Sequence, residues 1–222
     1  MTGLERVFRR VPGEGWLVLA GAVPELGGET ADLMERLLEK LDLSRPMAAM
    51  AAPDSDSTEL NVLLETLEEW LGGEAGLLEL DTDLGIDGWE DSGLLILIGD
   101  DPEIWIEALR GEADERLRRA LLQGTLILAV GGAARAFGTQ VVSSVRGEDL
   151  VPALNWIPGT MLASDLAEAR SRAVRSWLHS GEQRLVMYLE PSSILALGPE
   201  HQVERWGRVA PEVTLGSGWG KG

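Results

Sequence analysis

The residues best placed to do chemistry follow an apolar segment at positions 126–130, where the chain reads GGAAR from Gly131 to Arg135. Many hydrolases hold their nucleophile in a tight turn of small residues between a strand and a helix. The central residue of this turn is Ala133, which has no atom that can attack a substrate. The backbone N–H groups and Arg135 offer an anion site, but the sequence favours a purely structural turn.

Other candidate nucleophiles and bases are few. Serine hydrolysis requires a hydroxyl, a base within hydrogen-bond reach and a group that orients the base. Ser164 precedes a helical segment and suits its N-cap, and Ser143 and Ser144 read as ordinary strand or turn residues. His179 ends a helical segment and His201 follows a Gly-Pro turn, so we expect both on the surface. No serine–histidine pair is predicted.

Metal binding has no better candidates. Asp81, Asp83 and Asp87 lie in a glycine-containing segment whose spacing is loosely similar to a calcium loop. That segment lacks the third early ligand and the glutamate at the twelfth position, so a solvated acidic loop is favoured. Asp54 and Asp56 suit the cap of a following helix. We therefore expect no metal and no cofactor.

Composition excludes several classes of protein. The chain has 222 residues, a formal net charge of −18 and no cysteine. Such a charge argues against nucleic acids and anionic membranes as partners. No apolar run reaches the roughly 20 residues of a membrane helix, and the first residues lack the apolar core of a signal peptide. We expect a cytoplasmic protein with a single domain over 1–222, in which an arm at 1–14 and a tail at 216–222 are flexible.

The elements that position the turn alternate in type along the first 130 residues. Short apolar runs predict strands, and leucines at helical spacing predict helices between them. This order is typical of an α/β fold with a doubly wound, mostly parallel sheet and helices on both faces. The predicted strands are 15–20, 46–52, 76–80, 94–98 and 126–130, and the predicted helices are 29–41, one from residue 58, one from residue 102 and 112–123.

The remaining third of the chain is richer in short extended segments. A charged helix is predicted at 164–179, and the segments around it predict a β-rich C-terminal extension. We expect this extension to continue the same sheet and to give it an antiparallel edge. Its expected extended segments are 140–145, 153–157, 185–189, 194–197, 203–206 and 212–215.

The order of these elements resembles the cyanophycinase and aspartyl-dipeptidase family of serine peptidases, over roughly residues 15–215. The resemblance implies a flavodoxin-like, class I glutamine amidotransferase-like fold. The segments that carry it are Gly99-Asp100-Asp101-Pro102 after the fourth strand, the turn that starts at Gly131, Ile157-Pro158-Gly159, Asp165 with the arginines after it, and Leu189-Glu190-Pro191-Ser192.

The departures from the family pattern fall on the catalytic positions. The resemblance aligns Ala133 with the nucleophilic serine and Asp165 with the base histidine, and it places Arg135 where a small residue follows the elbow. If the turn keeps the backbone of a nucleophile elbow, Ala133 is expected to have a positive φ. Loss of both positions indicates that serine-hydrolase activity is gone.

The sequence therefore favours a peptidase-like protein that is no enzyme and that retains a crevice for a small molecule, a peptide or a partner protein. One alternative is an active peptidase or amidase with a relocated nucleophile or a water activated by Asp165. Another is an oligomeric structural protein, for example a homodimer. The residues expected at the crevice are Gly99, Asp100, Gly132, Ala133, Ala134, Arg135, Trp156, Asp165 and Glu190.

Overall fold

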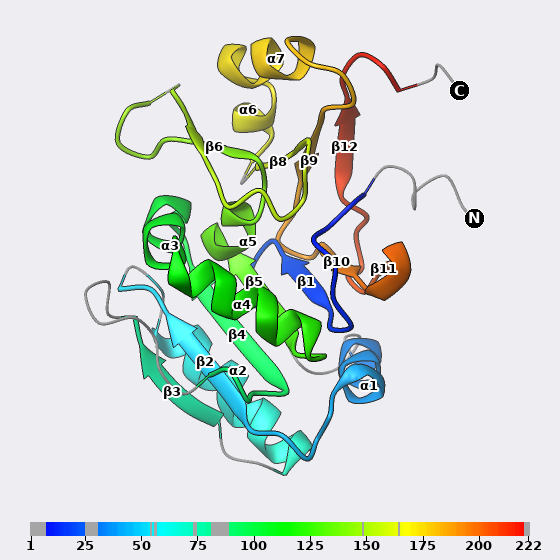
Figure 1. The fold of residues 1–222 in the computed structure, drawn as a ribbon. Helices are drawn as coiled ribbons and strands as arrows, with labels where there is room; N and C mark the ends of the chain where they lie inside the picture. The colour runs from blue at the N-terminus through cyan, green and yellow to red at the C-terminus, as the bar shows by residue number, and fades with distance from the viewer. Residues whose placement is uncertain are drawn as a thin grey trace.

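A seven-stranded sheet forms the larger part of the molecule (Figure 1). The computed structural model describes residues 8–24, 31–53, 55, 57–72, 75–80, 89–147, 149–163 and 165–219. Five parallel strands of this sheet come from the first 131 residues, and all five were predicted. They are β1 (Leu17–Ala20), β2 (Met47–Ala51), β3 (Ala75–Glu79), β4 (Leu94–Gly99) and β5 (Leu126–Gly131).

The strands lie in the spatial order β11-β10-β1-β5-β4-β2-β3. Flavodoxin-like sheets have the order 2-1-3-4-5, with the first strand inside. Here β2, β3, β4 and β5 follow that pattern, but β1 occupies the place of a fifth strand beside β5. The prediction of a flavodoxin-like sheet is therefore wrong in the position of the first strand. Local sequence patterns identify each strand but do not show which strands pair.

Helices cover both faces of this sheet, as the doubly wound prediction requires (Figure 1). α1 (Ala31–Lys40) and α2 (Ser57–Leu71) bury most of their described leucines on one face, which β4 meets through Ile96 and Ile98. α3 (Pro102–Ala108) and α4 (Glu112–Leu122) pack on the other face, which β4 meets through Leu95 and Leu97. The side chains of one strand point alternately to the two faces, so every β4 residue from Leu94 to Ile98 is buried.

A second sheet of five strands stands beyond the carboxyl ends of β1, β4 and β5 (Figure 1). Its order is β12-β9-β8-β6-β7, and its strands are β6 (Gln140–Val142), β7 (Leu150–Pro152), β8 (Thr160–Ala163), β9 (Leu185–Tyr188) and β12 (Glu212–Leu215). Of the late strands that the structure describes, β10 (Ile194–Leu197) and β11 (Val203–Arg205) extend the main sheet with antiparallel pairing, and the others form the second sheet. The prediction that all the late strands continue one sheet is therefore wrong.

Three local differences accompany the second sheet. β8 was not predicted, and β7 precedes the segment 153–157 that was expected to be extended. The helix expected at 164–179 is two helices, α6 (Leu166–Ala169) and α7 (Arg172–His179). The break occurs at Ser171, whose Oγ accepts a hydrogen bond from the Val174 N–H and caps α7.

The chain ends pack onto these sheets where the structure describes them. Phe8 and Arg10 of the expected arm are buried, with 3% and 9% of their surface exposed. Near the other end, Trp219 donates a hydrogen bond from Nε1 to the Arg184 carbonyl at 2.8 Å. Among the described residues, no helix is long and apolar enough to cross a membrane.

Candidate functional site

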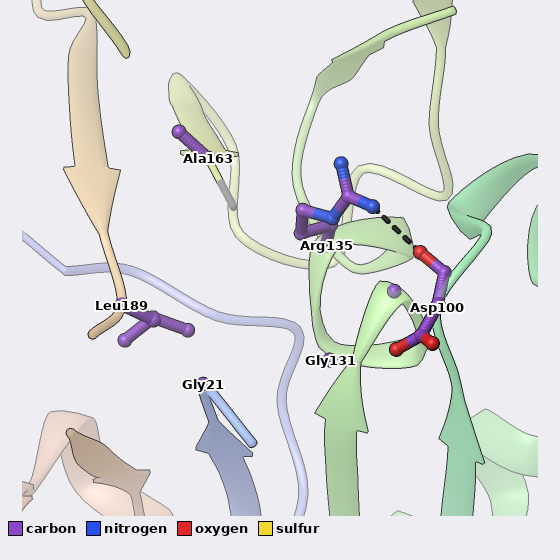
Figure 2. Close-up of a pocket in the computed structure, with 7 residues that line it drawn as sticks. Gly21, Asp100, Gly131, Arg135, Ala163 and Leu189 are labelled. Atoms are coloured by element: carbon purple, nitrogen blue, oxygen red, sulfur yellow. Dashed lines mark hydrogen bonds between the residues drawn. The ribbon is translucent and has the colours of Figure 1, made fainter. Parts of the chain in front are cut away.

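A crevice opens where the carboxyl ends of β1, β4 and β5 meet the second sheet. Ligands of open α/β sheets bind at such an edge. The crevice has a volume of about 270 Å³. In Figure 2, Arg135 and Asp100 lie on one side and Leu189 and Gly21 on the other. The lining residues are Gly21, Asp100, Gly131, Gly132, Arg135, Ala163 and Leu189.

The turn at the end of β5 has the strained backbone of an elbow, but at a different residue from the one expected. Gly131 has φ 64° and ψ −121° between β5 and the short helix α5 (Gly132–Ala136). Ala133 is not among the described residues with positive φ. The positive φ that an elbow centred on Ala133 would have is therefore found at Gly131, because β5 pairs with β4 through Gly131, opposite Gly99, and the turn begins two residues earlier.

This shift changes which residue stands at the nucleophile position. A nucleophile elbow places its reactive side chain on the strained residue between strand and helix, and that residue is Gly131. It has no side chain. Ala133 and Ala134 are fully buried in the core and do not line the crevice. Ala133 therefore fills space behind the elbow instead of facing a ligand.

Two other glycines are required by close backbone contacts around the crevice. A Cβ on Gly132 would lie 2.3 Å from the Asp100 carbonyl oxygen. A Cβ on Gly21 would lie 2.1 Å from the Glu190 carbonyl oxygen. The β1 and β4 ends thus approach neighbouring chain segments more closely than any side chain allows, and backbone atoms form much of the crevice wall.

Arg135 connects the elbow to both sheets. Its Nη2 donates to the Asp100 carbonyl at 2.6 Å, as Figure 2 shows, and its Nη1 lies 3.5 Å from Glu168 Oε1. The side chains of Arg135 and Glu168 are only 15% and 11% exposed. Glu168 belongs to α6, which packs against β8 and β9 of the second sheet, so this ion pair links the elbow of the main sheet to the second sheet.

Asp100 contributes a carboxylate that is not used in this network. Only its carbonyl contacts Arg135, while its side chain makes no hydrogen bond or ion pair within the part of the chain that the structure describes. A Cβ built on Gly131 would lie 3.4 Å from Asp100 Oδ1. The carboxylate therefore stands beside the space that a nucleophile would occupy. The following residue, Asp101, caps α3 by accepting from the Glu103 N–H at 2.8 Å.

Ser143 and Ser144 are not isolated residues of a strand, as the sequence suggested. The Ser143 hydroxyl donates to Glu103 Oε1 at 2.8 Å, and the Ser144 N–H donates to the same oxygen at 2.8 Å. The Ser144 hydroxyl lies 3.0 Å from Asp101 Oδ2. Burial raises the pKa of Glu103, but the hydrogen bonds from the two serines outweigh it and hold that pKa below its usual range. This cluster fastens the β6–β7 loop to the start of α3.

Replacement of Glu103 by glutamine should lower stability in a pH-dependent manner. Because the folded pKa lies below the unfolded value of about 4.3, the ionised carboxylate stabilises the fold above that value, and the contribution is lost as pH falls through the folded pKa. Urea denaturation should show a lower free energy of unfolding for Glu103→Gln at pH 7 and a smaller difference at pH 3. Glu107→Gln, at an exposed position one turn later in α3, is the control and should show no such dependence. An equal difference at both pH values would contradict this role.

Besides Ala133 and Ala134, three more of the residues expected at the crevice are not among its lining residues. Trp156 is fully buried and donates from Nε1 to Asp114 Oδ1 at 2.5 Å on the side of α4. Asp165 is exposed and acts as the N-cap of α6, where its Oδ1 accepts from the Glu168 N–H at 2.7 Å. Glu190 is not a lining residue, although its carbonyl contacts Gly21. Trp156 therefore has a partner in the core and Asp165 has a local capping role.

Other expected residues are placed as follows. Asp100, Gly132 and Arg135 line the crevice, and Gly99 lies directly below it at the end of β4. The sequence reasoning missed Gly21, Gly131, Ala163 and Leu189. A glycine that directly follows a buried strand was an available signal for Gly21 and Gly131, whereas the other two depend on the second sheet.

Neither histidine reaches the crevice. His201 lies in the turn after β10, beyond Gly198, which contacts Trp16 at the opposite edge of the main sheet. His179 is exposed at the end of α7. Within the described ranges, no three histidine, aspartate or glutamate side chains gather to hold a metal ion. Ser164 and the acidic positions Asp54, Asp56, Asp81, Asp83 and Asp87 lie outside the described residues.

Comparison with solved structures shows that the chain has a peptidase-like α/β fold. A peptidase from an acI-B1 Actinobacterium superposes with a TM-score of 0.61 over 93% of this chain and 97% of its own, at 13% identity. A candidate peptidase E from Listeria monocytogenes EGD-e gives a TM-score of 0.53 over 86% and 97%, at 12% identity. No protein-family model and no curated protein matches the sequence. At such identities the similarity concerns the fold alone.

Proposed function

We propose that this protein uses a peptidase-like fold without serine-peptidase chemistry and binds a small ligand in the crevice at the elbow. The observation that carries the proposal is the glycine at the elbow. Gly131 has the strained backbone of a nucleophile position but no side chain. Covalent catalysis requires a nucleophilic atom at this point, and the described histidines lie at other parts of the molecule.

Two further features support a retained binding role. The crevice has a volume of about 270 Å³, and its lining residue Arg135 forms a partly buried ion pair with Glu168. The close backbone contacts at Gly21 and Gly132 preserve its shape. On this proposal the chain is a non-catalytic relative of the cyanophycinase-like peptidases with a class I glutamine amidotransferase-like arrangement.

The proposal is tested by activity and by covalent labelling of the purified protein. We expect no hydrolysis of aspartyl or β-aspartyl peptides above the buffer rate, and no labelling by a fluorophosphonate probe, because the elbow residue Gly131 carries no hydroxyl. A Gly131→Ser variant, which adds a hydroxyl at the elbow without a histidine partner, should also remain inactive. Hydrolysis by the wild-type protein at enzyme-like rates would overturn the proposal.

A relocated serine is the second candidate, and Ser144 is the residue that favours it. Its hydroxyl lies 3.0 Å from Asp101 Oδ2 and 3.2 Å from Glu103 Oε1. A carboxylate is a weak base for a serine hydroxyl unless its pKa is raised, and the pKa of Glu103 is lowered. Fluorophosphonate labelling that disappears in Ser144→Ala would establish this alternative.

A further inference from the structure

The charged groups of the crevice are not balanced. Among the lining residues that the structure describes, Asp100 and Arg135 are the two that carry a charge. Arg135 is already engaged with the Asp100 carbonyl and with the Glu168 carboxylate. The Asp100 carboxylate has no partner of its own among the described residues, so the crevice presents one uncompensated negative charge.

Asp100 is exposed and stands beside the elbow. A Cβ built on Gly131 would lie 3.0 Å from the Gly99 carbonyl oxygen and 3.4 Å from Asp100 Oδ1. Two hydrogen-bond acceptors, one of them charged, therefore lie next to the glycine elbow, and both suit a donor such as an ammonium group. The opposite wall is formed by Gly21, Ala163 and Leu189, which offer no charge and suit a short apolar group (Figure 2).

We propose that the crevice binds a small primary amine, whose ammonium group contacts Asp100 above Gly131 while its short stem lies against Leu189 and Ala163. This inference rests on the proposed non-catalytic binding function and adds the class of ligand. Hydrogen bonds between an ammonium and a carboxylate are charge-assisted and stronger than neutral ones. The formal net charge of −18 also raises the concentration of small cations near the surface.

The proposal is tested by NMR titration of the protein labelled with ¹⁵N-glycine. Propylamine hydrochloride should shift the amide signals of Gly21, Gly131 and Gly132 with a saturable dependence on concentration. Propanol and sodium propionate, which have the same stem without the ammonium, should leave these signals unchanged. Alaninamide, a second amine probe, should bind more tightly than propylamine if the natural amine is a peptide amino terminus, and less tightly if it is an alkyl amine.

Two substitutions at the ends of the same strand provide the matched control. Asp100→Asn keeps the shape of the side chain after β4 but removes its charge, and it should weaken propylamine binding at least about tenfold. Asp91→Asn changes an exposed aspartate before β4, at the opposite edge of the sheet, and should leave the affinity unchanged. Equal binding of propionate, equal affinity in both variants, or shifts spread over remote glycines would overturn the proposal. Peptidase activity in the wild-type protein would refute the proposed function instead, and the two failures are therefore distinguishable.

Discussion

Replacement of Arg10 by methionine is expected to lower the free energy of unfolding by about 3–5 kcal/mol, as for other removed partners of buried charged networks. The side chain is 9% exposed and donates hydrogen bonds to four backbone carbonyls. Their distances are 3.0 Å from Nε to Gly198, 2.8 Å from Nη1 to Val11, and 2.9 Å and 2.7 Å from Nη2 to Gly13 and Gly15. Methionine fills similar space but leaves these carbonyls without a donor.

Arg10 is a cation at neutral pH in spite of its burial. Removal from water lowers the pKa of the guanidinium to about 10, against an opposing influence of Glu14. Its hydrogen bonds are therefore charge-assisted. They join the incoming segment 8–15 to the start of β1 and to the end of β10, which is why the expected N-terminal arm is anchored from Phe8 onward.

Urea denaturation of three variants measures this effect. Arg9→Met changes the exposed neighbouring arginine and should alter stability by less than about 0.5 kcal/mol. Arg10→Lys retains the charge but not the planar fork of donors, so it should fall between wild type and Arg10→Met. Comparable midpoints for Arg9→Met and Arg10→Met would show that the four hydrogen bonds contribute little.

The Gly132→Ala variant is expected to lose about 3 kcal/mol, near the upper end for an overpacked site. Its Cβ would lie 2.3 Å from the Asp100 carbonyl oxygen, 2.4 Å from the Asp100 carbonyl carbon and 2.8 Å from the Asp101 N. All three are backbone atoms, which cannot move aside as the end of a side chain can. The loop after β4 must therefore shift away from the elbow.

A matched glycine in the same sheet separates this clash from the general effect of glycine substitution. Gly76 lies in β3, and an added Cβ would meet only the Met47 carbonyl oxygen at 3.7 Å. Gly76→Ala should therefore be neutral or slightly stabilising in thermal unfolding. If Gly132→Ala unfolds at the same temperature as Gly76→Ala, the close approach of β4 and the elbow has been overestimated.

The same variant links stability to the crevice. Because the displaced loop contains Asp100, Gly132→Ala should also weaken propylamine binding, whereas Gly76→Ala should not. If Gly132→Ala is destabilised but still binds propylamine with wild-type affinity, binding does not depend on the position of the loop after β4, and the proposed ligand site is wrong.

Much of the fold could be predicted because the information is local. Apolar runs such as 94–98 and 126–130 are buried on both faces of a parallel sheet, and this burial makes them recognisable as strands. Leucines at helical spacing, such as Leu60, Leu63 and Leu67, face one side of a helix for the same reason.

Cytoplasmic location and homodimer formation remain predictions of the sequence.

The second sheet and the crevice could not be predicted from local sequence patterns. β6, β7 and β8 have three or four residues each, too few to establish a period, and each strand is defined by its neighbours. The ion pair between Arg135 and Glu168 joins residues 33 positions apart in sequence. Ala163 and Leu189 reach the crevice only because β8 and β9 pair in parallel and end at the same edge.

The sequence by itself determined that the turn after β5 holds no nucleophile, since none of the residues from Gly131 to Ala134 carries a reactive group. It did not determine which of these residues has the strained backbone, because two successive glycines permit a positive φ at either position. The tertiary structure decided this through the pairing of Gly99 with Gly131, which extends β5 by one residue. That register accompanies the burial of Ala133 in the core and leaves the elbow, beside the Asp100 carboxylate, without a side chain.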